Sequence, residues 1–119
     1  MISLKDRVQT ALAGMDAAVI YGYPRDFTGR ETICWRESEN RRYAQADGRE
    51  YLAELRYALE IFACGSERAA DLLAAADARM LAAGFQRENA LEQFERDLGI
   101  AHVSARYRAL ADDRGNIYQ

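Results

Sequence analysis

The chain of 119 residues contains few of the side chains from which metal and catalytic sites are usually built. It has one histidine, His102, and two cysteines, Cys34 and Cys64, which form no Cys-x-x-Cys motif. A zinc site would therefore lack ligands, and neither cysteine has a histidine nearby in the sequence to act as its base. The sequence also lacks a Gly-rich phosphate loop. We expect no metal, no cofactor and no enzymatic activity.

Long apolar runs are missing as well. The apolar stretches are rich in alanine and interrupted by charged residues, so they fall short of the roughly 20 residues that span a bilayer. Met1 to Asp6 do not resemble the start of a signal peptide. The net charge of -3 and the pI near 5.2 argue against a sequence-specific nucleic-acid binder, which usually carries a basic stripe. These features predict a cytoplasmic protein that does not contact the membrane and has two buried free thiols.

The composition is sufficient for one folded domain over residues 1–119. Half of the residues are hydrophobic and 29% are charged, and this length suits a single modest core. We predict a first helix from Ser3 to Ala13, with Ser3 as N-cap and Asp6 as the acid of a capping box. The short apolar run Ala17 to Tyr21 predicts a buried strand, and Gly22 to Arg30 holds the only proline and predicts a loop.

A long β-hairpin is the clearest local prediction. Residues 31–43 and 50–63 are read as two strands joined at Asp47-Gly48, a strong turn signal. Apolar side chains occupy every second position from Ala53 to Ala63, with Glu54 and Arg56 among the polar residues between them. Leu, Ala and Glu would also suit a helix, but the period of two favours a strand.

Counting outward from a two-residue turn gives a register for this hairpin. Opposite charges then face each other in two pairs, Glu39 with Arg56 and Arg41 with Glu54, each contributing about 0.2–1 kcal/mol. The other expected partners are Cys34 with Ile61, Ser38 with Tyr57, and Asn40 with Leu55. One face then carries Cys34, Leu59 and Ile61 as core, and the other carries Ile33, Trp35 and Phe62 at its base. A bulge would flip one strand.

The C-terminal half predicts a second helix and a second hairpin. Ser66 is the expected N-cap of a helix that runs to about Ala83, and Gly84 is its expected C-terminal glycine. Residues 91–96 and 101–109 are read as a hairpin around Leu98-Gly99. The order of elements predicts an α+β fold: an antiparallel β-sheet with a long projecting β-hairpin and two helices packed on one face.

Several segments of the chain resemble a known family. They are Val19-Ile20-Tyr21, the proline-containing Gly22-Tyr23-Pro24, Gly84-Phe85-Gln86-Arg87 after an Ala-rich helix, Glu95-Arg96-Asp97, and the closing strand His102 to Ala109. In order and in length the whole chain resembles the bacteriophage tail terminator, or tail completion, proteins.

The resemblance implies a structural role without catalysis. Tail terminators form a ring, here expected to be a homohexamer, on the completed tail tube of a phage or prophage. The ring provides the joint to the head-tail connector protein. The implied partners are therefore further copies of the chain, the tail tube protein and the connector, with DNA passing through the ring lumen. The implied location is the host bacterial cytoplasm during virion assembly, and then the virion tail.

Two surfaces are hypothetical interfaces. The first is the charged hairpin tip, and the second is the apolar base of the sheet: Arg41, Arg42, Asp47 and Arg49, then Ile33, Trp35 and Phe62. The tip charges either keep an edge-prone hairpin soluble or steer docking to a partner. The alternative function is a small α+β ligand-binding or homodimeric module of a metabolic or regulatory system, with the aromatic base as its pocket.

Overall fold

A computed structural model describes residues 1–23, 31–95 and 99–118. Two helices and six strands follow one another in an α+β fold, as predicted. In chain order they are α1 (Lys5–Leu12), β1 (Ala18–Tyr21), β2 (Thr32–Ala46), β3 (Arg49–Ala63), α2 (Ser66–Ala82), β4 (Gln86–Glu95), β5 (Ile100–Asp112) and β6 (Ile117–Tyr118). Most of the predicted loop at Gly22 to Arg30, and Arg96 to Leu98 of the second hairpin, lie outside the described residues.

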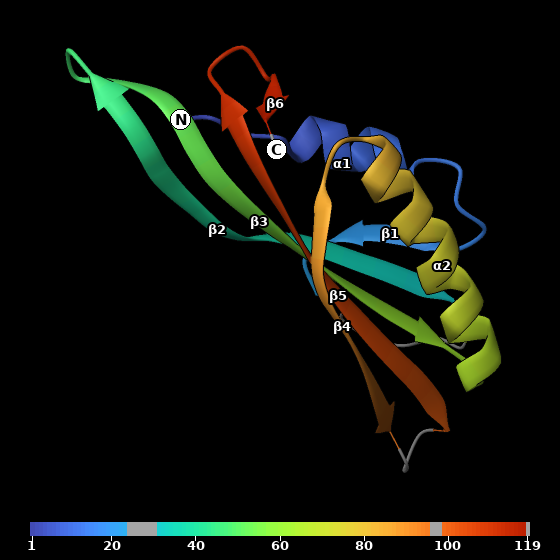
Figure 1. Ribbon diagram of the computed structural model, residues 1–119. Helices are drawn as coiled ribbons and strands as arrows, with labels where there is room; N and C mark the ends of the chain where they lie inside the picture. The colour runs from blue at the N-terminus through green and yellow to red at the C-terminus, as the bar shows by residue number, and fades with distance from the viewer. Residues whose placement is uncertain (24–30, 96–98, 119) are drawn as a thin grey trace.

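All six strands belong to one twisted sheet with both helices on the same face (Figure 1). The strand order is β1-β2-β3-β5-β4, and β6 pairs with β5. Strand β1 runs parallel to β2, with Val19 beside Ile33, while the other pairs are antiparallel. The prediction of a wholly antiparallel sheet was therefore wrong at this edge.

The long hairpin turns at the predicted residues. Asp47 and Gly48 have φ values of 54° and 72°, the left-handed pair that a two-residue hairpin turn of type I′ requires. The distal pairs follow the predicted register: Glu39 with Arg56, Asn40 with Leu55, and Arg41 with Glu54.

Nearer the base of the hairpin the register differs by one residue. Ser38 is an extra residue in β2, so Glu37 pairs with Tyr57 and Cys34 pairs with Glu60. The predicted pairs Cys34–Ile61 and Ser38–Tyr57 were wrong because this bulge reverses the face of every β2 residue below it.

The bulge decides which side chains enter the core. Ile33 and Trp35 pair with Ile61 and Leu59 on the face that the helices cover. Cys34 and Phe62 belong to the opposite face, since neighbouring residues in a strand alternate. The expectation that Ile33, Trp35 and Phe62 share one face was therefore wrong.

Both helices start differently from the prediction, whereas α2 ends as predicted. The backbone N–H of Lys5 donates to Ser3 Oγ at 3.2 Å, and Leu4 is the N-cap, so Ser3 does not form the expected capping box. Gly65 replaces Ser66 as the N-cap of α2. Gly84, with φ +104°, follows the helix, and Phe85 N–H donates to the Met80 carbonyl at 3.1 Å. This Schellman closure confirms the predicted role of Gly84.

The N-terminal segment is fastened to the long hairpin. Ile2 donates its N–H to Glu50 Oε1 at 3.0 Å, and its carbonyl accepts from Asn40 Nδ2 at 2.8 Å. Leu4 N–H donates to the Tyr57 hydroxyl at 3.0 Å. Ile2 and Leu4 are buried, so the segment covers apolar surface on the hairpin and limits how freely it can bend.

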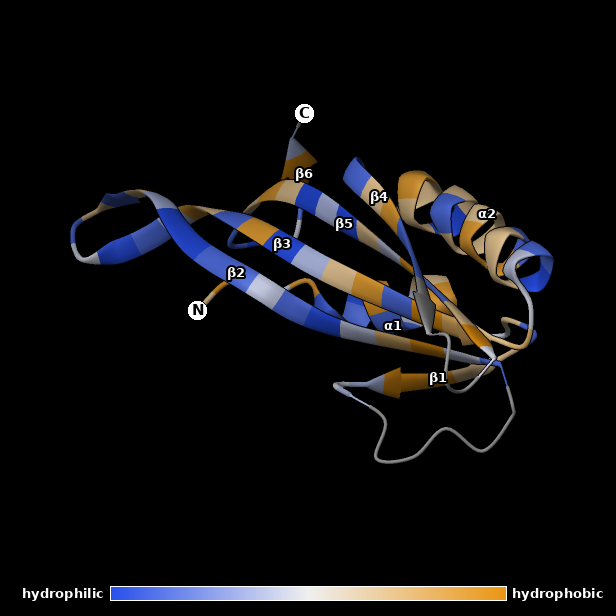
Figure 2. Cartoon of the chain, turned by 90° about the horizontal axis from the view of Figure 1, so that it is seen from below, coloured by the Kyte–Doolittle hydropathy of each residue, from blue (hydrophilic) through white to orange (hydrophobic). Residues whose placement is uncertain are grey.

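The molecule is long and narrow, with principal extents of 53 × 24 × 22 Å. The end of the β2–β3 hairpin projects away from the helices (Figure 1), and its distal part is largely hydrophilic (Figure 2). The predicted second hairpin is also present, as β4 and β5, with β4 starting earlier than expected, at Gln86.

Candidate interaction surfaces

The four predicted tip residues gather at the end of the long hairpin. Arg41 and Arg42 lie on β2, Asp47 lies in the turn, and Arg49 begins β3. All four are exposed. They share the distal half of the hairpin because the turn at Asp47-Gly48 folds β3 back along β2, while Arg41 and Arg42, as neighbours in a strand, project to opposite faces.

Each of the three arginines pairs with a carboxylate of its own chain, and in each pair the arginine faces solvent more than the carboxylate does. The guanidinium side chains are 60%, 60% and 64% exposed, whereas the carboxylate side chains are only 7%, 16% and 23% exposed. The pairs are Arg41–Glu54 at 3.7 Å, Arg42–Glu50 at 3.6 Å, and Arg49–Asp113. Apart from the exposed Asp47 in the turn, the hairpin end therefore presents cations to solvent and keeps their counter-charges beneath.

Two exposed tyrosines complete this surface. Tyr43 and Tyr51 are 56% and 40% exposed. Neither has a partner in the β2–β3 register, because each is the extra residue at one of two adjacent register shifts. The Arg49 guanidinium lies 5.6 Å from the centre of the Tyr51 ring. We call Arg41, Arg42, Tyr43, Arg49 and Tyr51 the distal hairpin surface. Arginine and tyrosine are among the residues that contribute most to protein interfaces.

Sequence reasoning missed the two tyrosines. A signal was available, because Tyr43 follows Arg41-Arg42 and Tyr51 follows Arg49-Glu50, one on each side of the turn in a polar stretch. Large aromatic side chains in a solvated hairpin end contribute little to a core, which makes them candidates for contact with a partner.

The second predicted interface is not a surface of this molecule. Ile33 and Trp35 are 0% and 3% exposed. The Trp35 ring lies 4.7 Å from that of Tyr21 and 6.3 Å from that of Tyr57. Phe62 remains half-buried on the other face of the sheet, where its ring stacks on His102 at 4.3 Å.

The face of the sheet away from the helices carries a network of ion pairs centred on Arg56. Its guanidinium contacts Glu39 at 2.8 Å, Glu54 at 2.5 Å and Glu88 at 2.9 Å, which confirms the predicted Glu39–Arg56 pair. Arg108 binds Glu54 at 2.9 Å from the next strand. Hydrogen bonds from Arg108 and Arg56 lower the pKa of Glu54. The network joins β2, β3, β4 and β5 across the middle of the sheet.

Cys34 lies at the base of the same face and is a poor nucleophile. The thiol is buried, and burial together with the charge of Glu60 raises its pKa to about 11. At neutral pH it is therefore protonated, and nucleophilic catalysis needs the thiolate. Glu60 is held by His102 Nε2 at 2.5 Å and by Arg36 at 3.6 Å. The two cysteines are not joined, as predicted, but Cys64 is exposed, so the prediction that both thiols are buried was wrong for it.

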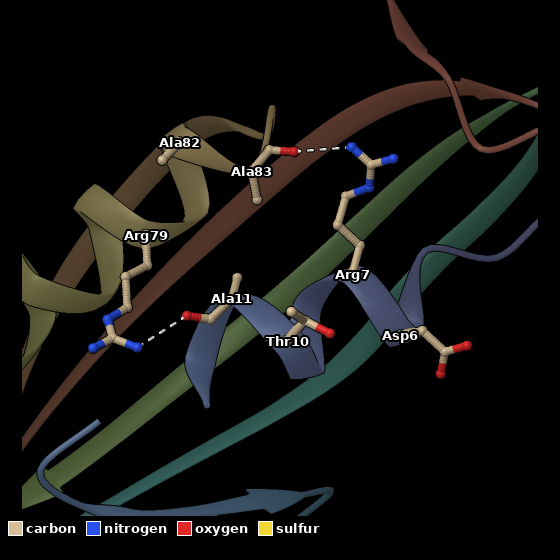
Figure 3. Close-up of a pocket in the computed structure, with 7 residues that line it drawn as sticks. All are labelled: Asp6, Arg7, Thr10, Ala11, Arg79, Ala82 and Ala83. Carbon is tan, nitrogen blue, oxygen red and sulfur yellow. Dashed lines mark hydrogen bonds between the residues drawn. The ribbon is translucent and has the colours of Figure 1, made fainter. Parts of the chain in front are cut away.

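A cavity of about 500 Å3 lies between the two helices (Figure 3). Its arginines are used by the fold. Arg7 donates to the carbonyls of Ala83, at 3.3 Å, and Gly115, at 2.7 Å. Arg79 donates to Ala11 at 3.3 Å and Ala13 at 2.5 Å. Each arginine thus satisfies carbonyl groups near the C-terminal end of the other helix. The two arginines in this cavity therefore hold the helices together.

Within the described residues no cluster of histidine, cysteine and carboxylate groups is suited to hold a metal ion. None of the described helices is long and apolar enough to cross a bilayer. The distal hairpin surface, with its exposed arginines and tyrosines, is the strongest candidate for function. Comparison of the sequence with family models and with curated proteins gives no match.

Proposed function

We propose that this protein is a phage or prophage tail terminator. It closes a finished tail tube as a ring, expected to be hexameric, and forms the joint to the head-tail connector. Its partners are copies of itself, the tail tube protein and the connector, and it carries no catalytic site.

The order of the elements supports the proposal. The resemblance implies a short helix, a strand, a loop, a long hairpin, a second helix and a terminal hairpin. The chain has α1, β1, the β2–β3 hairpin, α2 and the β4–β5 hairpin in that order.

The observation that carries the proposal is the orientation of charge at the distal hairpin surface. Solubility alone would be served by charges of either sign in any arrangement. Here three arginines face solvent over shielded carboxylates, beside two exposed tyrosines. A cationic, aromatic projection at one end of a 53 Å molecule is suited to steer and fix an encounter with an acidic protein surface.

The test is to shorten the hairpin without touching the core. Replacing Tyr43 to Leu52 by Asn-Gly keeps Arg42 opposite Ala53 as the last pair and supplies a favourable turn. The variant loses no core residue. It loses the Glu50 contacts to Ile2 and Arg42 and the Arg49–Asp113 pair, so we expect its melting temperature to fall by a few degrees. In a phage or prophage that depends on the chain it should yield unjoined heads and tails or overlong tails.

The matched control is Ala46→Thr, at an exposed position of the same hairpin end, which keeps the hairpin length and the turn. It should complement fully. Normal infectious particles from the shortened variant would overturn the role of the hairpin. A tight dimer at every concentration in native mass spectrometry, in place of monomer and hexamer, would instead favour a homodimeric module.

A further inference from the structure

A shallow groove lies between α2 and the edge strand β4, with a volume of about 250 Å3. It is lined mainly by apolar side chains and by one acid: Ala70, Leu73, Ala90, Leu91, Val103 and Glu92. We call it the α2–β4 groove. Ala70 and Ala90 are exposed and Leu73 is only partly buried, so apolar surface reaches solvent here. Leu91 lines only the edge of the groove, because it pairs with Ser104 on the face away from the helices.

The rim of the groove is acidic. Glu92 lines it from β4 and is exposed. Glu67 is exposed on α2 and precedes Ala70 by three residues, which places both on the same side of the helix. An apolar floor between two carboxylates is complementary to aromatic rings flanked by arginines.

The distal hairpin surface has that composition. Its tyrosines are Tyr43 and Tyr51, and the arginines beside them face solvent over their shielded partners. The chain as a whole has a net charge of -3, so this cationic end contrasts with the remainder of the molecule. Charge complementarity therefore favours a second copy of the chain as the occupant of the groove.

The two surfaces lie toward opposite ends of the long molecule. The hairpin projects from one end, and the start of α2 lies toward the other (Figure 1). A hairpin end therefore cannot reach the groove of its own chain. Contacts between two unlike surfaces are head-to-tail, and such contacts generate a closed ring or an open filament instead of a symmetric dimer.

We propose that the distal hairpin surface of one copy docks into the α2–β4 groove of the next. Tyr43 and Tyr51 contact the apolar floor, and the arginines face Glu67 and Glu92. This inference rests on the proposed ring and deepens it by naming the two surfaces that join its subunits.

The experiment compares three variants of the full chain by sedimentation over a concentration series. The hairpin variant is Tyr43→Thr with Tyr51→Thr, which removes both rings and keeps residues that suit strands. The groove variant is Ala90→Arg, at an exposed position. The matched control is Tyr23→Thr, the same change at another exposed tyrosine, 66% exposed. Circular dichroism and the melting temperature show that each variant folds.

The wild-type chain and the control should associate alike, and each of the other variants should associate at least tenfold more weakly. A mixture of the hairpin and groove variants should form a heterodimer, because one intact hairpin end still meets one intact groove. A symmetric interface could not be restored in this way.

Other outcomes overturn the inference and leave the proposed function separately testable. If both variants assemble like wild type, the interface lies elsewhere, while the complementation test still decides the role of the protein. A wild-type chain that stays monomeric at every concentration also overturns it. So does a hairpin variant that self-associates normally but loses binding to a labelled oligonucleotide, since the occupant would then be nucleic acid.

Discussion

Two buried tyrosine hydroxyls fasten separate parts of the fold to the sheet. Tyr57 donates to Glu37 Oε1 at 2.9 Å and accepts from Leu4 N–H. Tyr107 donates to Asp77 Oδ1 at 2.7 Å on α2. Burial is the largest cause that raises the pKa of both hydroxyls, so they stay protonated and can act as donors. One holds the N-terminal segment, and the other holds the second helix.

Replacing each tyrosine by phenylalanine should have unequal effects. Tyr57→Phe removes the partner of a buried backbone N–H as well as a bond to a carboxylate, so we expect a loss of about 1–3 kcal/mol in the free energy of unfolding. Tyr107→Phe should cost about 1 kcal/mol, since Asp77 keeps its 2.8 Å contact with Arg87. Urea denaturation measures both. Equal losses would mean that Tyr57 does not hold Leu4.

Glu54 should make stability depend on pH in the acidic range. Its pKa in the folded chain lies below the ordinary glutamate value of about 4.3 because Arg108 and Arg56 bind it. A lowered pKa stabilises the fold above the ordinary value, and this contribution is lost as the pH falls through the folded value. At neutral pH the wild-type chain should therefore have a higher melting temperature than Glu54→Gln. This difference in melting temperature should narrow below about pH 4.3. A difference that widened in acid would contradict this assignment.

At the scale of elements, hydrophobic pattern and turn chemistry were enough to predict most of the sheet. The alternation from Ala53 to Ala63 and the Asp47-Gly48 turn predicted β3 and the hairpin correctly. The bulge at Ser38 could not be predicted, because Glu37-Ser38-Glu39 is uniformly polar and nothing in that pattern marks one residue as extra. That single residue moved Ile33 and Trp35 from a supposed interface into the core.

The contacts of the hairpin end depend on long-range folding. Arg49 pairs with Asp113, at the far end of the chain, and Glu54 binds Arg108 on β5. Local spacing predicted the Arg41–Glu54 pair only because one turn joins the two strands. The direction of β1 was equally hidden, since four residues carry no signal that distinguishes parallel from antiparallel pairing.

The bulge allows a prediction with a close control. Deleting Ser38 should give one continuous register that keeps Trp35 in the core, Glu37 beside Tyr57 and Glu39 beside Arg56. Deleting Arg36 instead should also remove the bulge, but it would place Ser38 opposite Tyr57 and lose the bond to Glu37. We expect deletion of Arg36 to be the more destabilising by about 1.5–3 kcal/mol, the net value of a hydrogen bond to a charged group.

Thermal and urea unfolding of the two deletion variants provide the measurement. If removing Ser38 were the more damaging change, the extra residue would be needed for its own contacts. It would then do more than set the faces of β2.

At the scale of the whole molecule, the core and the projecting hairpin differ in how their backbone is held. Strand β3 pairs on both sides from Leu52 to Phe62, with β2 and with β5. Between Leu52 and the turn at Asp47-Gly48 the hairpin is a two-stranded ribbon in the described structure. Such ribbons are only marginally stable alone. Arg49 and Tyr51 of the distal hairpin surface therefore lie in a weakly supported part of the sheet, whereas Arg41 and Arg42 lie where β3 also pairs with β5.

Hydrogen exchange should reveal this difference and its reversal on assembly. In dilute protein the amides of Gln45 to Tyr51 should exchange much faster than those of Leu55 to Ala63, because opening the ribbon exposes little apolar surface. At concentrations where rings form, the ribbon should become protected together with Ala90 to Glu92, the groove segment of the neighbouring copy. The hairpin variant Tyr43→Thr with Tyr51→Thr should show neither gain. If assembly protected another surface and left the ribbon exchanging as before, the hairpin end would not be the joint between subunits.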